Sequence, residues 1–367
     1  MDLTRLIDLF EKEGQSPWLD NLRRSWLNSG ELADWVVKGV RGVTSNPSIF
    51  EKAMTDTDDY DLEFRRLIAD GKDVSECYWD LVISDILGAL EVLKPVHIES
   101  NGSDGFVSVE VDPRLARDTS GTLESARSLH NRINKPNVLI KIPAAKESIP
   151  AVEAMISEGR SVNVTLIFSL SRYAEVMEAY ISGLENCSGD LSKVSSVASF
   201  FISRTDTEVD KRLDAIGSQR SEELKGQAAV ALGQVAYSLF KETFSGPRWE
   251  ALESRGARVQ RPLWASTSTK NPDYLDTLYV DTLIGPNTVN TLPNNTIDAF
   301  EDHGTIARTV DADSGGAEKT LNEISSLGID FEEVGDVLEA EGIDSFITSF
   351  ENLIKSLSLK ATSFQQD

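Results

Sequence analysis

Short apolar segments rich in β-branched residues recur along most of the chain, and turn-forming residues bound them. Segments of this kind are typical of strands that are buried on both faces of a parallel sheet. Between most of them, apolar residues recur three and four positions apart, which predicts amphipathic helices. Seven strands are predicted in this way, at residues 40–45, 106–111, 138–142, 162–168, 195–202, 262–266 and 278–284.

This alternation predicts an α/β protein in which parallel strands are joined by crossover helices. The chain has no glycine-rich dinucleotide-binding turn, so the visible strands favour a closed (β/α)8 TIM barrel over a doubly wound open sheet. We expect the eighth strand in the short region at residues 18–21. Because the chain shows no internal repeat, low-complexity linker or sharp change in composition, we expect one domain over residues 1–367.

Additional N- and C-terminal helices are predicted outside the barrel. Residues 222–244 are predicted to form one long helix that ends before Gly246. Near the C-terminus, an apolar face at helical spacing is expected to pack on the barrel, with dimerisation or coverage of the active site as alternatives. The N-terminal stripe comprises Leu3, Leu6, Ile7 and Phe10, and the C-terminal face comprises Phe346, Ile347, Phe350, Leu353, Ile354 and Leu357.

Acidic residues dominate the composition, with 60 Asp and Glu against 36 Lys and Arg and a net charge of −24. This balance favours solubility and argues against a nucleic-acid or anionic-membrane partner. A phosphorylated ligand would then need a local cluster of basic side chains. The sequence shows neither a signal peptide nor a long apolar span, so we expect a cytoplasmic protein.

Residues that commonly bind metals are scarce. The two cysteines, Cys77 and Cys187, cannot form a disulfide framework, and neither belongs to a CxxC motif. The three histidines, His97, His130 and His303, share no short motif. The sequence therefore predicts neither a metal site nor a Ser-His-Asp triad, and we expect no metal or other cofactor.

The apolar run at residues 137–143 contains a single amine, Lys141, and ends at Pro143. An ammonium in a buried strand must be paired or lose its proton, because burial disfavours the charged form. A neutral lysine is a nucleophile that forms a Schiff base with a carbonyl substrate. On this segment alone, a lysine that reaches solvent from the end of a strand is the more ordinary explanation.

Polar residues at the ends of the other predicted strands favour the catalytic interpretation, because the chemistry of (β/α)8 barrels lies at the carboxyl ends of the strands. A glutamate inside a strand is costly unless it is paired or functional. A turn of small residues followed by a lysine can bind an anion. The residues at these ends are Asn46, Ser108, Glu110, Asn163, Thr165, Ser199, Arg204, Ser266 and Lys270.

Four segments resemble those of the transaldolases in the same order and spacing, and the resemblance covers about residues 16–293. The segments are Thr44-Ser45-Asn46-Pro47-Ser48, Val109-Glu110-Val111-Asp112, Leu139-Ile140-Lys141-Ile142-Pro143 and Asn163-Val164-Thr165-Leu166-Ile167-Phe168-Ser169. The extra length and the turn at residues 264–272 resemble the longer bacterial subgroup. The resemblance implies a barrel of the class I aldolase group.

The resemblance also implies a reaction of the non-oxidative pentose phosphate pathway. A dihydroxyacetone unit moves from sedoheptulose 7-phosphate to glyceraldehyde 3-phosphate, which gives erythrose 4-phosphate and fructose 6-phosphate. The ligands implied are therefore small sugar phosphates. No metal is required, because the protonated imine acts as the electron sink.

Individual roles follow from the same resemblance. Lys141 matches the Schiff-base lysine, and Glu110 with Thr165 matches the pair that holds a catalytic water. Asp20 falls near the family's acid/base aspartate, but residues 16–22 have a poor strand pattern, so Asp34 stays the alternative acid. Asn46, Asn163 and Ser199 match residues that hydrogen-bond to the bound three-carbon unit. Arg204, Ser266 and Lys270 match residues that bind the phosphate, and the match of Lys270 assumes a two-residue insertion.

Two rival functions fit part of the pattern. A fructose 6-phosphate or deoxyribose-phosphate type aldolase would use the same lysine, although such barrels are much shorter. A non-catalytic sugar-phosphate-binding barrel would need Ser266 and Lys270 but would have no need for Lys141 inside a strand. The sequence leaves open whether the protein is a monomer or a homodimer.

Overall fold

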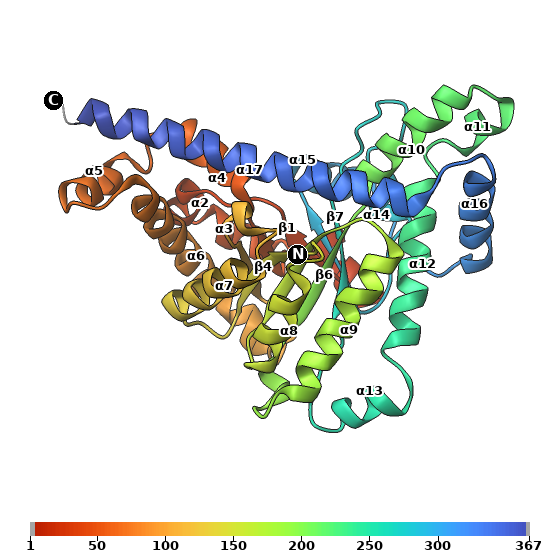
Figure 1. Ribbon diagram of the computed structural model, residues 1–367, viewed down its shortest axis with the longest axis horizontal. Coiled ribbons are helices and arrows are strands. Elements are labelled where there is room, and N and C mark those ends of the chain that lie inside the picture. Colours follow the sequence, from red (N-terminus) through yellow and green to blue (C-terminus); the bar gives the residue numbers. More distant parts are fainter. Residues whose placement is uncertain (1–3, 365–367) are drawn as a thin grey trace.

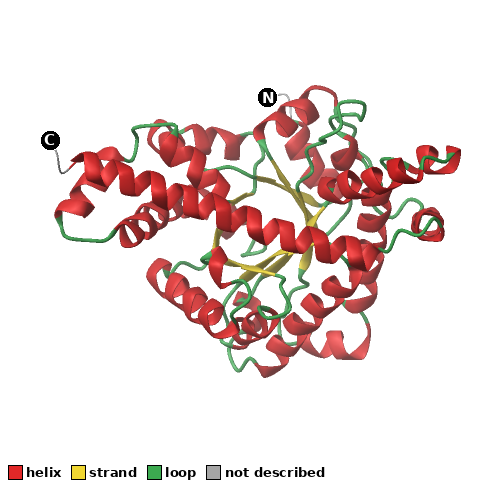
Figure 2. Ribbon diagram, turned by 45° about the horizontal axis from the view of Figure 1, so that its top comes forward, coloured by secondary structure: helices red, strands yellow, loops and turns green. Residues whose placement is uncertain are grey.

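The computed structural model describes residues 4–364, and its eight strands close into a barrel of parallel neighbours in chain order. Figure 1 and Figure 2 show the strands surrounded by helices, which confirms the predicted (β/α)8 TIM barrel. The strands are β1 (Gln15–Leu19), β2 (Gly42–Thr44), β3 (Phe106–Glu110), β4 (Val138–Pro143), β5 (Val162–Ile167), β6 (Ser196–Phe201), β7 (Arg261–Ala265) and β8 (Thr288–Leu292).

Helices precede the barrel, connect its strands and extend beyond β8. Those before β3 are α1 (Arg5–Glu13), α2 (Arg24–Ser29), α3 (Glu31–Val37), α4 (Pro47–Thr55), α5 (Asp61–Ala69) and α6 (Val74–Glu99). Those between β3 and β7 are η1 (Pro113–Leu115), α7 (Thr119–Ile133), α8 (Ile149–Ser157), α9 (Leu170–Asn186), η2 (Leu191–Lys193), α10 (Ser203–Ile216), α11 (Gln219–Leu224), α12 (Ala228–Thr243) and α13 (Gly246–Glu253). The rest are α14 (Leu278–Asp281), α15 (Asn294–His303), α16 (Ser314–Ser326) and α17 (Phe331–Phe364).

The two predicted terminal helices are present as α1 and α17. In α1, Leu6 and Leu9 are buried, whereas Leu3 of the predicted stripe lies outside the described residues. The strand expected at residues 18–21 is β1, which begins at Gln15 instead and pairs with both β2 and β8. The first strand therefore ends directly before Asp20, and this position matters for the site.

The prediction of a strand at residues 278–284 was wrong. This apolar segment forms α14 and the turn after it, and Tyr279 is buried there with its hydroxyl donating to Asp206 Oδ2 at 2.8 Å. The strand that closes the barrel is β8, in which Thr288, Asn290 and Thr291 interrupt the apolar residues. Because these three buried polar residues, on both faces of the strand, break a continuous apolar run, the sequence pattern did not reveal this strand.

The prediction of one helix over residues 222–244 was also wrong, because α11 ends at Leu224 and α12 begins at Ala228. Gly226 lies in the break with a left-handed φ of 70°. Its N–H donates to Asp210 Oδ1 at 3.0 Å, and a Cβ atom at this position would lie 2.7 Å from the ring of Tyr274. A glycine in this conformation ends a helix at little steric cost.

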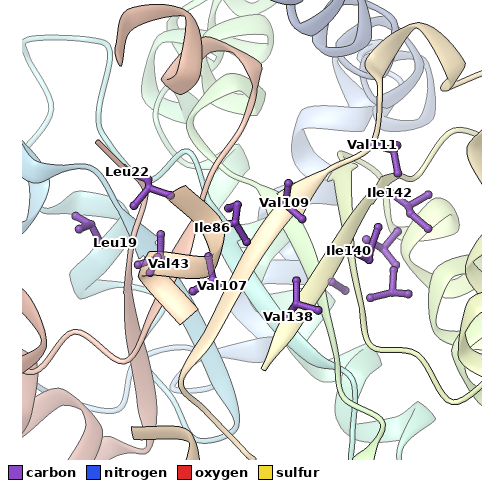
Figure 3. Packing of buried hydrophobic residues seen from close by; sticks show 14 of the residues in the cluster. Leu19, Leu22, Val43, Ile86, Val107, Val109, Val111, Val138, Ile140 and Ile142 are labelled. Carbon is purple, nitrogen blue, oxygen red and sulfur yellow. The ribbon is translucent and has the colours of Figure 1, made fainter. Parts of the chain in front are cut away.

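Side-chain alternation along the strands separates the core from the barrel interior. Val109 of β3 points outward and packs in the same cluster as Ile86 of α6 (Figure 3). Successive side chains of a strand point to opposite faces, so Glu110 points inward. On β4 the same rule places Ile140 in the outer core and Lys141 inside the barrel.

The C-terminal helix α17 crosses the end of the barrel at which the strands finish. It is the long blue helix of Figure 1, and it passes across the strands in Figure 2. Two glycines allow this approach: a Cβ atom at Gly335 would lie 2.8 Å from Ser169 Cβ, and one at Gly342 would lie 3.0 Å from Leu166 Cδ2. The predicted C-terminal apolar face therefore packs on the barrel.

Candidate active site

A cavity of about 260 Å³ opens at the carboxyl ends of the strands, where α17 contributes Phe346 to its lining. The structure brings most of the predicted site residues to this one cavity. They are Asp20, Asn46, Lys141, Thr165, Ser199, Arg204, Ser266 and Lys270. Glu110 and Asn163 do not line the cavity, but each contacts a residue that does.

A larger cavity of about 560 Å³ lies at the opposite end of the strands, where Phe106 begins β3 and Val138 begins β4. Its lining includes His97, His130 and Arg258 and contains none of the predicted catalytic or substrate-binding residues. Because the chemistry of this barrel class lies at the carboxyl ends of the strands, the smaller cavity is the candidate active site.

Lys141 is buried and paired with a carboxylate. Its Nζ lies 3.4 Å from Glu110 Oε2, and the two side chains are 5% and 3% exposed. Glu110 and Lys141 are register partners on β3 and β4, which places the two groups side by side. The amine also donates to the carbonyl oxygen of Ser45 at 3.2 Å. Lys141 therefore does not reach solvent from a strand end.

Burial dominates the electrostatics of Glu110. It raises the pKa of this carboxyl to about 7, although the positive charge of Lys141 acts in the opposite direction. A group with this pKa populates both its acid and its base form near neutral pH, which suits proton transfer. Strongly shifted pKa values of this kind cluster at functional sites.

Three buried oxygen atoms flank Lys141 without a hydrogen-bond partner among the described residues. They are Oγ1 of Thr165, on β5, and both carboxylate oxygens of Glu110, on β3, of which Oε2 has only its ion-pair contact with Lys141 at 3.4 Å. Leaving a buried polar atom unpaired costs about 1–3 kcal/mol, so such atoms call for a functional explanation. A water molecule or a substrate hydroxyl can both donate and accept hydrogen bonds and would suit this pair of residues.

The backbone next to Thr165 departs from regular strand geometry. The register between β5 and β6 shifts between Val164 and Ile167, and Leu166 has a left-handed φ of 61°. A bulge of this kind redirects side chains and is common beside active sites. Strain in a non-glycine residue at positive φ persists only where surrounding packing imposes it. Here the packing includes Gly342 of α17, against which Leu166 lies.

Asp20 follows the last residue of β1 and lies in the cavity. Its Oδ1 accepts a hydrogen bond from Thr44 Oγ1 at 2.6 Å, and Thr44 in turn lies 2.6 Å from Thr291 Oγ1. Burial raises the pKa of Asp20, while Lys141, Thr44 and Lys270 counteract this effect in that order. Asp34, the alternative acid, is exposed on α3 and does not line the cavity.

A chain of polar side chains connects three strands inside the barrel. Ser199 Oγ on β6 donates to Asn163 Oδ1 at 2.7 Å, and Asn163 Nδ2 on β5 donates to Ser108 Oγ on β3 at 3.0 Å. This chain fixes which way the Asn163 amide points. Asn46 is held differently: its Oδ1 caps α4 by accepting from the N–H of Ile49 at 3.0 Å, which leaves its Nδ2 group free of the cap.

Two basic side chains, Arg204 and Lys270, meet at the other side of the cavity. Among the described residues neither of them forms a direct ion pair with a carboxylate, although the charge of Glu341 acts on Arg204 and that of Asp20 acts on Lys270. Burial lowers the pKa of both groups, and the charge of Arg204 lowers that of Lys270 further. Ser266 lies between β7 and Lys270 with a left-handed φ of 56°, and its Oγ is 2.9 Å from Ser203 Oγ. Two neighbouring cations that form no direct ion pair with a carboxylate suit the binding of an anion.

Sequence reasoning missed several residues that line this cavity. Thr44 lies in a segment that was noted, but its bond to Asp20 depends on the unexpected position of β1. Thr291 was missed because β8 was missed. Phe201 ends β6 and could have been found, since it lies within the strand predicted at residues 195–202 and two positions after Ser199, on the same face. Phe346 comes from α17 and was placed on the C-terminal apolar face, for which coverage of the active site was an alternative; its position in the cavity was not predicted.

Within residues 4–364, no helix combines the length and apolar character needed to cross a bilayer. The same residues contain no group of three or more His, Cys, Asp and Glu side chains arranged to hold a metal ion.

Comparison with known proteins places the chain in a family. Residues 17–357 match the family described as Transaldolase/Fructose-6-phosphate aldolase. A transaldolase from Mycobacterium tuberculosis (strain ATCC 25618 / H37Rv) is 49% identical over 348 residues, which are 93% of each chain. A transaldolase from Arthrobacter sp. (strain FB24) is 49% identical over 346 residues, also 93% of each chain. The chain belongs to the transaldolase/fructose-6-phosphate aldolase family, whose members are enzymes.

Proposed function

We propose that the chain is a transaldolase, which transfers a dihydroxyacetone unit from sedoheptulose 7-phosphate to glyceraldehyde 3-phosphate through a Schiff base on Lys141. The observation that carries this proposal is the buried amine of Lys141, 3.4 Å from Glu110, in a cavity that also contains two unpaired cations. An amine in this setting suits attack on a ketone, and the cations suit a phosphate on the same substrate.

The first step is imine formation. The uncharged amine of Lys141 attacks the ketone carbon, and the resulting carbinolamine loses water to give a protonated imine. Glu110 and Thr165 flank Lys141 on the neighbouring strands and hold a water molecule that relays the protons of this step. Their unpaired oxygens support this role, as does the pKa of about 7 for Glu110.

The second step breaks the C3–C4 bond. Asp20 takes the proton of the C4 hydroxyl, and the bonding electrons move into the protonated imine, which becomes a neutral eneamine. Erythrose 4-phosphate leaves when sedoheptulose 7-phosphate is the donor. Glyceraldehyde 3-phosphate then enters, the eneamine carbon attacks its aldehyde, and Asp20 returns the proton to the new hydroxyl. Hydrolysis of the imine releases fructose 6-phosphate.

The remaining polar residues bind the substrate. Asn46, Asn163 and Ser199 hold the hydroxyls of the three-carbon unit, which stays on the enzyme between donor and acceptor. The bond between Ser199 and Asn163 supports this assignment, because it orients the amide before substrate arrives. The phosphate lies between the side chains of Arg204, Ser266 and Lys270.

The cellular setting follows from the substrates. Phosphorylated sugars carry charge and do not cross membranes freely, so we place the reaction in the cytoplasm, with small-molecule sugar phosphates as ligands. No nucleic-acid or membrane partner is proposed for a chain with a net charge of −24. A monomer and a homodimer are both compatible with the proposal.

A fructose-6-phosphate aldolase is the second candidate, because the family description covers both activities. The two activities differ in the fate of the three-carbon unit. With fructose 6-phosphate as donor, a transaldolase turns over quickly only when erythrose 4-phosphate is present as acceptor, and it makes sedoheptulose 7-phosphate. An aldolase releases free dihydroxyacetone without an acceptor. A binding protein that is not an enzyme would do neither.

A further inference from the structure

Phe346 is the aromatic side chain that α17 places over Lys141. The side chain is 5% exposed and lines the active-site cavity. The centroid of its ring lies 5.8 Å from Lys141 Nζ. Within the described part of the chain, every other residue that lines this cavity belongs to a barrel strand, to the loop after it or to the first turn of the helix that follows. Phe346 is therefore an addition to the barrel site from a distant part of the sequence.

Close packing fixes the position of the helix that carries this ring. The absence of a side chain at Gly342, one turn before Phe346, lets α17 rest on Leu166, directly after Thr165. One turn or so beyond the ring, Ser349 Oγ lies 2.7 Å from Ser48 Oγ at the start of α4. The ring thus lies between two points at which the helix touches the rim of the barrel.

The cavity beneath the ring is otherwise rich in groups that attract water. Asp20, Thr44 and Asn46 line it, together with Thr165 and Ser199. The other aromatic lining residue, Phe201, lies 5.7 Å from the guanidinium of Arg204 on the phosphate side. Phe346 is thus the large apolar group next to the reactive nitrogen.

The proposed reaction has an intermediate for which this arrangement matters. After cleavage, the three-carbon eneamine either attacks the acceptor aldehyde or takes a proton from water on its nucleophilic carbon. Protonation gives an imine cation, and hydrolysis of that cation consumes one water molecule and releases dihydroxyacetone and the free lysine. The first route is transfer, and the second is simple aldol cleavage. Excluding water from the site favours transfer.

We propose that Phe346 determines the specificity of the reaction by shielding the lysine-bound three-carbon intermediate from water. This inference rests on the proposed transaldolase function and adds to it a residue outside the barrel that suppresses aldol cleavage. The α17 helix covers the active-site cavity in a fixed position, and the ring of Phe346 is the part of it that shields the intermediate. The ring itself takes no part in proton transfer.

Phe350 provides a matched control on the same helix. It is one turn further along α17, it is also a phenylalanine, and it is 1% exposed. Its ring packs 5.2 Å from that of Tyr78 and 4.7 Å from the guanidinium of Arg114, and it does not line the cavity. Removing it weakens the attachment of α17 to the barrel but leaves the ring over Lys141 in place.

The test compares wild type, Phe346→Ala, Phe346→Leu and Phe350→Ala with fructose 6-phosphate as donor. Free dihydroxyacetone is measured without acceptor, and sedoheptulose 7-phosphate is measured with erythrose 4-phosphate present. The ratio of release to transfer should rise by about tenfold or more in Phe346→Ala, the scale on which a lost apolar contact changes discrimination. It should rise less in Phe346→Leu and stay near the wild-type value in Phe350→Ala. Thermal unfolding of each variant confirms that it is folded.

Two results would overturn the inference while leaving the proposed function intact. One is an unchanged ratio in Phe346→Ala, and the other is an equal rise in Phe346→Ala and Phe350→Ala, which would assign the effect to loosening of α17 in general. Failure of the proposed function looks different, because the wild-type protein would then form no sedoheptulose 7-phosphate from these substrates.

Discussion

Lys141 Nζ lies 3.4 Å from Glu110 Oε2 inside the barrel, and the two residues are register partners on neighbouring strands. Both side chains are almost fully buried, so neither is stabilised by bulk water. Removing one partner of such a pair leaves the other charge buried and uncompensated, which makes the pair costly as a purely structural feature. The proposed roles of Lys141 as nucleophile and Glu110 as part of a proton relay account for the presence of both groups.

The pKa of Glu110 predicts a pH dependence for the first chemical step. Because burial raises this pKa to about 7, Glu110 is protonated below pH 7 and ionised above it. Loss of water from the carbinolamine needs a proton donor, so formation of the borohydride-trappable adduct should slow as the pH rises through about 7. Glu110→Gln has no titrating group at this position, and its single-turnover profile should lack this inflection. The same inflection in Glu110→Gln would assign it to another residue.

The separate roles of Asp20 and Glu110 predict different stalled states. Asp20→Ala should form the imine with fructose 6-phosphate but fail to cleave it, so a six-carbon adduct should accumulate on Lys141. Glu110→Ala should slow the formation of any adduct. Removing a positioned acid or base typically costs about 10²–10⁴ in rate. Mass spectrometry of the reduced protein distinguishes six-carbon from three-carbon adducts.

Asp34→Ala is the control for this experiment, because Asp34 is exposed on α3 and was the alternative acid in the sequence. It should behave as wild type. A normal three-carbon adduct in Asp20→Ala, or a stalled six-carbon adduct in Asp34→Ala, would reassign the cleavage step.

The two unpaired cations of the cavity predict a selective loss of affinity. Arg204→Ala should make the binding free energy of fructose 6-phosphate less favourable by about 2–4 kcal/mol, the cost of removing one partner of a charged hydrogen bond. Fructose, which has no phosphate, should be affected much less. Arg212 on the same helix pairs with Glu208 and does not line the cavity, so Arg212→Ala is the control. An equal loss for both substrates in Arg204→Ala would indicate a structural role.

A buried carboxyl outside the site predicts a pH-dependent stability. Asp206 accepts hydrogen bonds from Tyr279 and from the N–H of Ala229, yet burial raises its pKa to about 6. The stability that its neutral form contributes is present below about pH 4 and is lost as the pH rises through about 6. Asp206→Asn has no titrating group at this position. The free energy of unfolding of this variant minus that of wild type should therefore increase from pH 4 to pH 7, by up to about 3 kcal/mol. A difference that stays constant over this range would contradict the assignment.

The sequence predicted the barrel and much of the site for identifiable physical reasons. A strand buried on both faces reads as an apolar run, and a lone lysine or glutamate in such a run stands out, as Lys141 and Glu110 did. The same rule explains the failure at β8, whose buried polar residues hydrogen-bond to other buried polar groups and so interrupt the apolar run. One of them, Asn290, accepts a hydrogen bond from Thr267 at 2.9 Å. The apolar run at residues 278–284, which forms α14 and the turn after it, was predicted to be a strand instead.

Features that depend on distant contacts could not be predicted from local patterns. The hydrogen bond from Thr44 to Asp20 joins the ends of two strands, and its partner Thr291 comes from a third. Phe346 belongs to an apolar helical face that was expected to pack on the barrel, but the pattern does not say which of its residues lies over Lys141. Only the crossing of α17 over the barrel, with Gly342 against Leu166, brings that ring to Lys141.

Borohydride trapping of the imine identifies the lysine that acts as the nucleophile. The protein is incubated with fructose 6-phosphate, reduced with borohydride, digested and analysed by mass spectrometry. We predict a reduced three-carbon adduct on Lys141 alone, and no adduct in Lys141→Arg, which should remain folded but inactive. An adduct on Lys270, Lys146 or Lys38, or an adduct that persists in Lys141→Arg, would contradict the account.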